Sequence, residues 1–239
     1  MKLCALLLIL ITSFSWAVSF NVVTEEYPPY NYSDKGKVTG ISTEIIQEIL
    51  LRTGIDYQLK VYPWARSYKM ATEEPNTIIY SITYTEQRKP LFKWVGPLIP
   101  TTVDVFAKKS SMIKINGYDD LKNYKIGVVK DDIGEQLLIS NGVPASNLEE
   151  VAQPLLNLKK LAIDRVDMVS YEGNVVNWLL TNNDMTPSDY EKVYTLQEGQ
   201  LYIGFEKNTP DDVINKCQAA LDEMKKDGTY NKILQTYMK

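Results

Sequence analysis

The chain has 239 residues, a formal net charge of −4 and no histidine. Apolar residues make up 44% and charged residues 23%, as in an ordinary globular protein with enough chain for one large domain or two small ones. The missing histidine excludes Ser-His-Asp and Cys-His catalytic arrangements and removes the commonest zinc ligand. A mildly acidic chain with no dense Lys/Arg block also lacks the electrostatic basis for binding nucleic acid.

Residues 1–19 predict a secretory signal peptide. Lys2 precedes an apolar run over residues 3–11, and small residues follow through Ser19. The run is shorter than the roughly twenty apolar residues that a membrane-spanning helix needs. Cleavage after Ala17 and cleavage after Ser19 both fit the small-residue rule, and both stay open. We expect export to the periplasm, after which Cys217 is the remaining cysteine and lies on an apolar helix face that favours a buried thiol.

Short β-branched runs alternate with longer segments of helical period, which predicts an α/β architecture with largely parallel sheets. A first unit should contain strands at 20–24, 57–62 and 77–83 and helices at 41–53 and 64–71. A second unit should contain strands at 103–108, 125–130, 167–171 and 201–205 and helices at about 134–140, 155–163 and 175–180. Two helices broken at Asp227-Gly228 should end the chain. No flexible linker separates the units, so we expect two lobes joined by strands.

Five segments carry a resemblance to a known family. In chain order they read EEYPPYNYSDKGKVTGISTEIIQEI, PWARSYKMA, SITYTEQRKPLFKWVGPL, DRVDMVSYEGNVVNWLL and LDEMKKDGTYNKILQTYM. At this order and spacing the chain resembles the family 3 extracellular (periplasmic) solute-binding proteins of amino-acid ABC importers, as a divergent branch. The resemblance implies a two-lobed periplasmic binding protein-like fold of type II, with two α/β lobes joined by two crossing strands.

The same resemblance implies a division of the chain. After the signal peptide, residues 20–104 and 204–239 would form lobe 1, and residues 105–203 would form lobe 2. The crossings should fall near residues 103–107 and 203–207. A ligand would lie in the cleft between the lobes, and hinge closure around it is the expected motion.

In lobe 1, the resemblance places Arg88 where the family has an arginine that grips an α-carboxylate. A guanidinium suits this role because it donates two parallel hydrogen bonds and keeps its charge. Ser81 and Thr83 match positions that contact the same carboxylate, although both also read as polar residues that end a buried strand. Tyr27 matches an aromatic that packs over the ligand, and Tyr30 and Tyr32 are alternatives for that place.

Trp64 and Arg66, in the segment PWAR, are further candidates for the cleft. Trp64 would form a cleft wall, with a core tryptophan as the alternative. Arg66 would supply a second positive charge, with a structural ion pair as the alternative.

In lobe 2, Glu172 stands where the family usually has an Asp that accepts the ligand's ammonium. A carboxylate directly after an apolar strand is well placed to face a cleft at the strand's carboxyl end. Asp131 and Asp132 depart from the family, which has small residues there at a helix N-terminus. Two interpretations stay open: these acids cap the helix, or they contact a more cationic or carboxylate-poor ligand.

We therefore expect a monomeric, non-enzymatic protein that captures a small polar, amino-acid-like solute and delivers it to the permease of an ABC importer. It should need no cofactor and no metal, and it should bind no nucleic acid. One alternative is a periplasmic sensor that presents the solute to a membrane receptor. A less favoured alternative is a dehydratase that uses Glu172 as a general acid.

Overall fold

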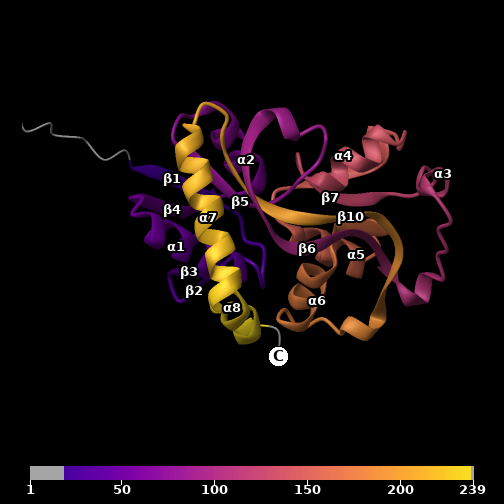
Figure 1. Ribbon diagram of the computed structural model, residues 1–239. Coiled ribbons are helices and arrows are strands. Elements are labelled where there is room, and N and C mark those ends of the chain that lie inside the picture. The colour runs from indigo at the N-terminus through magenta and orange to yellow at the C-terminus, as the bar shows by residue number, and fades with distance from the viewer. Residues whose placement is uncertain (1–18, 238–239) are drawn as a thin grey trace, which may run out of the picture.

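Two strands of 17 residues each organise the molecule. The computed structural model describes residues 19–237, so the predicted signal peptide lies outside the described residues apart from Ser19. Strands β6 (Phe92–Lys108) and β10 (Tyr190–Glu206) pair antiparallel along their length and pass from one side of the molecule to the other (Figure 1). They occupy the middle of a mixed sheet with the order β4-β1-β5-β10-β6-β9-β7-β8.

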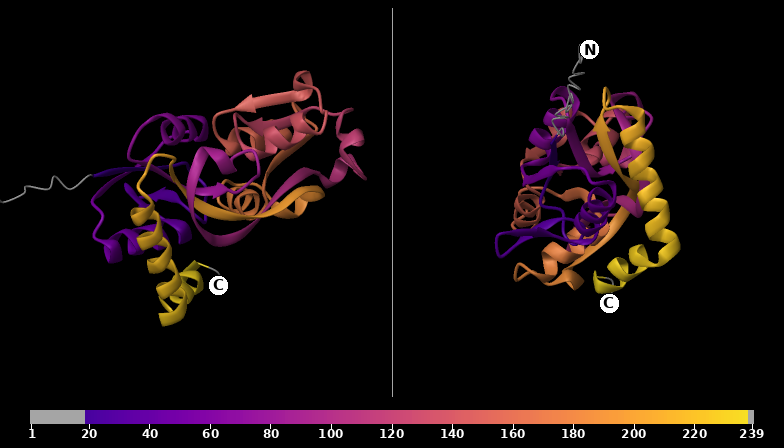
Figure 2. Two further views of the ribbon diagram at one scale, coloured as in Figure 1. Left: turned by 45° about the horizontal axis from the view of Figure 1, so that its top comes forward. Right: turned by 60° about the vertical axis from the view of Figure 1, so that its left-hand side comes forward.

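Lobe 1 is built on a small parallel sheet. Strand β1 (Phe20–Thr24) pairs with β4 (Tyr57–Val61) on one side and β5 (Thr77–Thr83) on the other. The remaining elements of this lobe are the hairpin strands β2 (Tyr32–Asp34) and β3 (Lys37–Thr39) and the helices α1 (Ile41–Thr53), α2 (Trp64–Glu73), α7 (Asp211–Asp227) and α8 (Thr229–Tyr237). The C-terminal helices return to lobe 1 and pack against α1 (Figure 2).

Lobe 2 repeats the arrangement. Strand β7 (Ile126–Val129) pairs in parallel with β8 (Leu148–Val151) and β9 (Met168–Glu172). Its helices are α3 (Tyr118–Leu121), α4 (Ile133–Ser140), α5 (Pro154–Ala162) and α6 (Gly173–Thr181). Short 3-10 turns are η1 (Lys89–Leu91), η2 (Lys109–Ser111), η3 (Ala145–Asn147) and η4 (Pro187–Asp189). The expected two α/β lobes joined by two strands are confirmed.

The strand partners locate the passage between the lobes. Residues 103–107 of β6 pair with β9 of lobe 2, whereas residues 201–205 of β10 pair with β5 of lobe 1. Residues 100–102 and 198–200 pair with each other and, within residues 19–237, with no third strand. The crossing thus lies just before the expected segments 103–107 and 203–207. The lobe boundaries at 104/105 and 203/204 stay a prediction, and this pairing supports an exchange a few residues earlier in each strand.

Most predicted elements agree with the structure to within one or two residues. The two long strands are the main correction, because β6 begins at Phe92 rather than 103 and β10 begins at Tyr190 rather than 201. The half-exposed first part of β10 lacks the alternation of apolar and polar residues that marks a strand, and Gly96-Pro97 interrupts the first part of β6. Strand β8 and the β2–β3 hairpin were not predicted.

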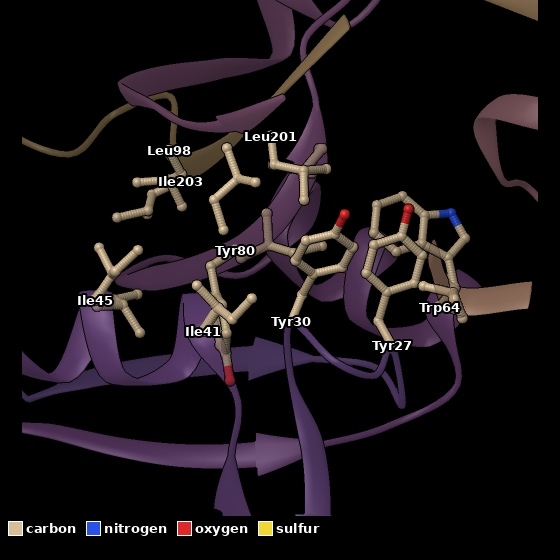
Figure 3. Close-up of a cluster of buried hydrophobic side chains, with 14 of the residues drawn as sticks. Tyr27, Tyr30, Ile41, Ile45, Trp64, Tyr80, Leu98, Leu201 and Ile203 are labelled. Atoms are coloured by element: carbon tan, nitrogen blue, oxygen red, sulfur yellow. The ribbon is translucent and has the colours of Figure 1, made fainter. Parts of the chain in front are cut away.

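The hydrophobic core of lobe 1 extends to a group of aromatic side chains at one of its ends. Ile45, Ile46 and Ile49 of α1 are fully buried, as the helical period predicts, and helix α1 ends at Gly54 with a φ of 66°. Figure 3 shows the rings of Tyr30, Tyr27 and Trp64 side by side at one end of this core. Among the described residues, no helix has the length and apolar character that crossing a membrane requires.

Candidate functional site

Arg88 lies at the centre of the site. It follows β5, where its backbone N–H donates to the Thr85 hydroxyl at 3.1 Å, and its side chain is only 1% exposed. One guanidinium nitrogen, Nη1, donates to the Thr83 carbonyl at 3.4 Å. The Nε and Nη2 atoms have no partner among residues 19–237. These two form the edge that binds a carboxylate through parallel hydrogen bonds, so the arginine is oriented by the protein on one side and free on the other.

Aromatic rings enclose this guanidinium. Its central carbon lies 5.1 Å from the ring centroid of Trp64 and 5.3 Å from that of Tyr68. Burial lowers the pKa of Arg88, and the nearby Asp132 carboxylate opposes that effect. The rings exclude water and favour a cation, which keeps the guanidinium charged in this dry setting.

Strand β5 is distorted beside Arg88. Ser81 has a φ of 59°, and the pairing with β10 skips it, so it forms a β-bulge. A serine in this left-handed conformation is strained, and such strain concentrates at functional sites. Ser81 is buried, and its hydroxyl has no partner among the described residues, while Thr83 contributes the carbonyl that holds Arg88.

Glu172 reaches the site from lobe 2. It is the last residue of β9 and the N-cap of α6, and its Oε2 accepts from the Val175 N–H at 2.8 Å. Its Oε1 accepts from the Tyr30 hydroxyl and from the Asn174 amide, each at 3.1 Å. Burial raises the pKa of Glu172 to about 7, although these donors oppose the rise. The hydrogen bond to Tyr30 joins lobe 2 to lobe 1.

Asp132 is also buried, close enough to Arg88 for the two charges to act on each other, and it is the N-cap residue of α4. Burial raises the pKa of Asp132, whereas Arg88 and then the amides of Ile133 and Gly134 oppose the rise. No hydrogen bond from these amides to the carboxylate has capping geometry. The position is therefore that of a cap, and the carboxylate is also influenced by the charge of Arg88.

Asp131 is exposed and takes part through its backbone. Its carbonyl accepts from the Trp64 indole Nε1 at 2.8 Å, which makes a second hydrogen bond between the lobes. Trp64 thus makes three kinds of interaction: its ring packs on the Arg88 guanidinium, it belongs to the hydrophobic core of lobe 1, and its indole donates a hydrogen bond to lobe 2.

Glu25 is a site residue that the sequence analysis missed. It follows β1 directly, is 6% exposed, and accepts from the Tyr171 hydroxyl of lobe 2 at 3.1 Å. Burial, and then the charge of Asp132, raise the pKa of Glu25 well above its usual value. Glu25 has the same signal as Glu172, because an acid directly after an apolar strand is placed to face the cleft. This signal could have identified Glu25 from the sequence.

The tyrosines form the contact between the lobes. The ring of Tyr27 lies 5.4 Å from that of Tyr30 and 5.5 Å from that of Tyr171, centroid to centroid. Tyr27 is buried close to Glu172 and Asp132, whose charges add to burial in raising its pKa. Tyr32 instead packs against Trp178, with 5.5 Å between the ring centroids.

The structure therefore brings together most of the residues that the sequence predicts. Arg88, Ser81, Thr83, Tyr27, Trp64, Asp132 and Glu172 are all buried in or beside one interlobe cluster. Arg66 does not join it, because it is exposed and its guanidinium lies 3.9 Å from the ring centroid of Tyr62. Their roles in binding stay predictions.

Two grooves between the lobes reach this cluster. One, of about 230 Å³, is lined by Glu25 and Tyr62 of lobe 1 and by residues 152–154 of lobe 2. The other, of about 740 Å³, is lined by uncharged residues that include Tyr30 and Asn174. Within residues 19–237, no group of three or more His, Cys, Asp or Glu side chains is arranged to hold a metal ion.

Known proteins share both this sequence pattern and this fold. The L-cystine-binding protein TcyJ of Escherichia coli is 23% identical over 85% of this chain and 76% of its own length. A histidine kinase sensor domain with similarity to periplasmic binding proteins matches 92% of this chain and 95% of its own, with a TM-score of 0.83 and 18% identity. An ancestral arginine-binding protein bound to arginine matches 92% of this chain and 98% of its own, with a TM-score of 0.80 and 24% identity.

The family model provides the assignment. Residues 21–239 match the model for bacterial extracellular solute-binding proteins, family 3, which covers almost the whole chain. The low identities to individual relatives agree with a divergent branch. The chain therefore belongs to the bacterial extracellular solute-binding proteins of family 3.

Proposed function

We propose that this protein captures an amino acid between its two lobes in the periplasm and delivers it, in the closed form, to the permease of an ABC importer. The observation that carries this proposal is the free edge of Arg88. Two N–H donors of a fully buried guanidinium, unpaired among the described residues, demand an acceptor, since an unsatisfied buried charge is costly. The α-carboxylate of an amino acid supplies two acceptor oxygens with the matching geometry.

The second anchor is Glu172. Its carboxylate lies on the opposite lobe and is held by the N-terminus of α6, so a ligand that binds both Arg88 and Glu172 holds the lobes together. An α-ammonium group would replace the Tyr30 hydroxyl as a donor to Oε1. Tyr27 and Trp64 would then cover the apolar part of the ligand.

This site acts by binding rather than by catalysis in our proposal. Three protein donors already orient the Glu172 carboxylate, which suits a fixed anchor for a cation. Relatives of this chain carry names of substrate-binding proteins, among them L-cystine-binding proteins and an arginine-binding protein. Delivery to a permease and a monomeric state belong to the same proposal.

Isothermal titration of the purified protein with a panel of the twenty amino acids and cystine tests the proposal. Arg88→Ala should weaken binding of the ligand found by about 30-fold or more, because it removes one partner of a buried charge pair. Arg66→Ala is the matched control, since it removes the same charge from an exposed side chain, and it should leave affinity within about threefold. Equal affinities for Arg88→Ala and the unaltered protein would refute the role of Arg88.

A further inference from the structure

The charges buried between the lobes do not balance. Arg88 brings one positive charge, whereas Glu25, Asp132 and Glu172 bring three carboxylates, and each of the four side chains is less than a tenth exposed. Arg66, the other arginine near this region, is exposed and stacked on Tyr62. When all four groups are ionised, the site therefore carries a net charge of −2, which low-dielectric surroundings oppose.

Two helix N-termini offset part of this excess of negative charge. Glu172 caps α6, and Asp132 stands at the N-cap position of α4, where the helix dipole presents roughly half a positive charge. Asp132 also lies close enough to Arg88 for the two charges to act on each other. Glu25 has no helix terminus beside it, because it follows a strand, and the side-chain donor that it accepts from is the neutral Tyr171 hydroxyl. The charge of Arg88 also acts on Glu25, but that one positive charge is shared with Asp132.

We infer that the ligand is a basic amino acid whose side-chain cation is bound by Glu25. The inference rests on the proposed function and adds the class of amino acid to it. The α-carboxylate would occupy the free edge of Arg88 and the α-ammonium would face Glu172. The second positive charge would face Glu25, which borders the interlobe groove of about 230 Å³. With a neutral amino acid, Glu25 and Asp132 would share the one positive charge of Arg88, and a diamine would leave the Arg88 edge unpaired.

Paired ligands with and without the side-chain cation test its contribution to binding. Titrations at pH 7.5 compare L-arginine with L-citrulline and L-lysine with L-norleucine, and putrescine represents a cation without a carboxylate. We expect arginine or lysine to bind about 100-fold more tightly than its uncharged counterpart. Glu25→Gln should reduce that ratio to about tenfold or less and leave the affinity for the uncharged counterpart nearly unchanged.

Glu73→Gln is the matched control, because it removes one negative charge from an exposed side chain of lobe 1 that lies 3.9 Å from the Lys69 ammonium. It should preserve the preference for the basic amino acid. Glutamine retains an oxygen that accepts from Tyr171, and an unchanged melting temperature of the Glu25→Gln protein verifies its folding.

The outcomes separate the two proposals. Tight, Arg88-dependent binding of citrulline, cystine or another uncharged amino acid, with no preference for the basic one, overturns the inference and leaves the proposed function intact. Putrescine binding that survives Arg88→Ala overturns it in favour of a diamine site. No binding of any amino acid overturns the proposed function itself.

Discussion

Replacing Glu172 by glutamine should weaken the pH dependence of closure in the unliganded protein. In the closed structure, burial raises the pKa of Glu172 from 4.5 to about 7. Opening the lobes would return this carboxyl to water and bring its pKa back toward the ordinary value. The protonated carboxyl favours the closed form below about pH 4.5, and this stabilisation is lost as pH rises through 7. The difference corresponds to roughly 3 kcal/mol, or about a hundredfold change in the equilibrium between closed and open forms.

Small-angle scattering of the ligand-free protein at pH 5 and pH 8 measures this effect as a change in the radius of gyration. The unaltered protein should be more compact at pH 5 and expand at pH 8. Glu25 and Asp132 also have raised pKa values and act in the same direction, so Glu172→Gln should diminish the expansion rather than abolish it.

Glu135→Gln is the matched control for this experiment. Burial raises the pKa of Glu135 to about 7 as well, but its carboxylate accepts from the Asp131 N–H of its own lobe at 2.6 Å. It should therefore retain the pH response of the unaltered protein. An equal expansion of the Glu172→Gln and unaltered proteins would refute the reasoning.

Three further experiments test other parts of the structure. Trp64→Phe removes the 2.8 Å hydrogen bond to the Asp131 carbonyl, so ligand affinity in titration should fall by about threefold to tenfold, and an unchanged value would show that this hydrogen bond does not stabilise the closed form. A Cβ at Gly134 would lie 2.6 Å from the Ser170 hydroxyl oxygen, so Gly134→Ala should cost roughly 1–3 kcal/mol in urea unfolding, and Ser170→Ala should recover most of it. Simple additivity of the two changes would count against that contact. Burial raises the pKa of the Cys217 thiol to about 11, so alkylation of the native protein at pH 8 should be slow, whereas rapid reaction would show an accessible thiol.

The sequence predicts those parts of the fold whose residues alternate between core and solvent with one regular period, or are buried throughout. Helix α1 and the fully buried strand β5 have such regular patterns, and their predicted bounds agree with the structure. The crossing strands change their surroundings along their length, because they leave one lobe and enter the other. Their residues near the crossing are half-exposed and mixed in character, so β6 and β10 were predicted only in part.

The residues of the site were likewise predicted only in part. Arg88 and Glu172 follow from the family resemblance, and the structure places both in the interlobe cluster. Glu25 was missed although it has the same signal as Glu172, an acid that directly follows an apolar strand. The alternative that Asp132 contacts a more cationic ligand together with Glu172 already implied more acids than Arg88 can balance. The share of Glu25 in that negative charge was missed, because it depends on which acids from the two lobes meet when they close.

A crystal structure of the protein with the amino acid selected by titration would test the central claim most directly. The ligand should lie between the lobes, with its carboxylate within hydrogen-bonding distance of Nε and Nη2 of Arg88 and its ammonium on Glu172. A ligand bound elsewhere, or one that leaves the Arg88 edge without an acceptor, would contradict it.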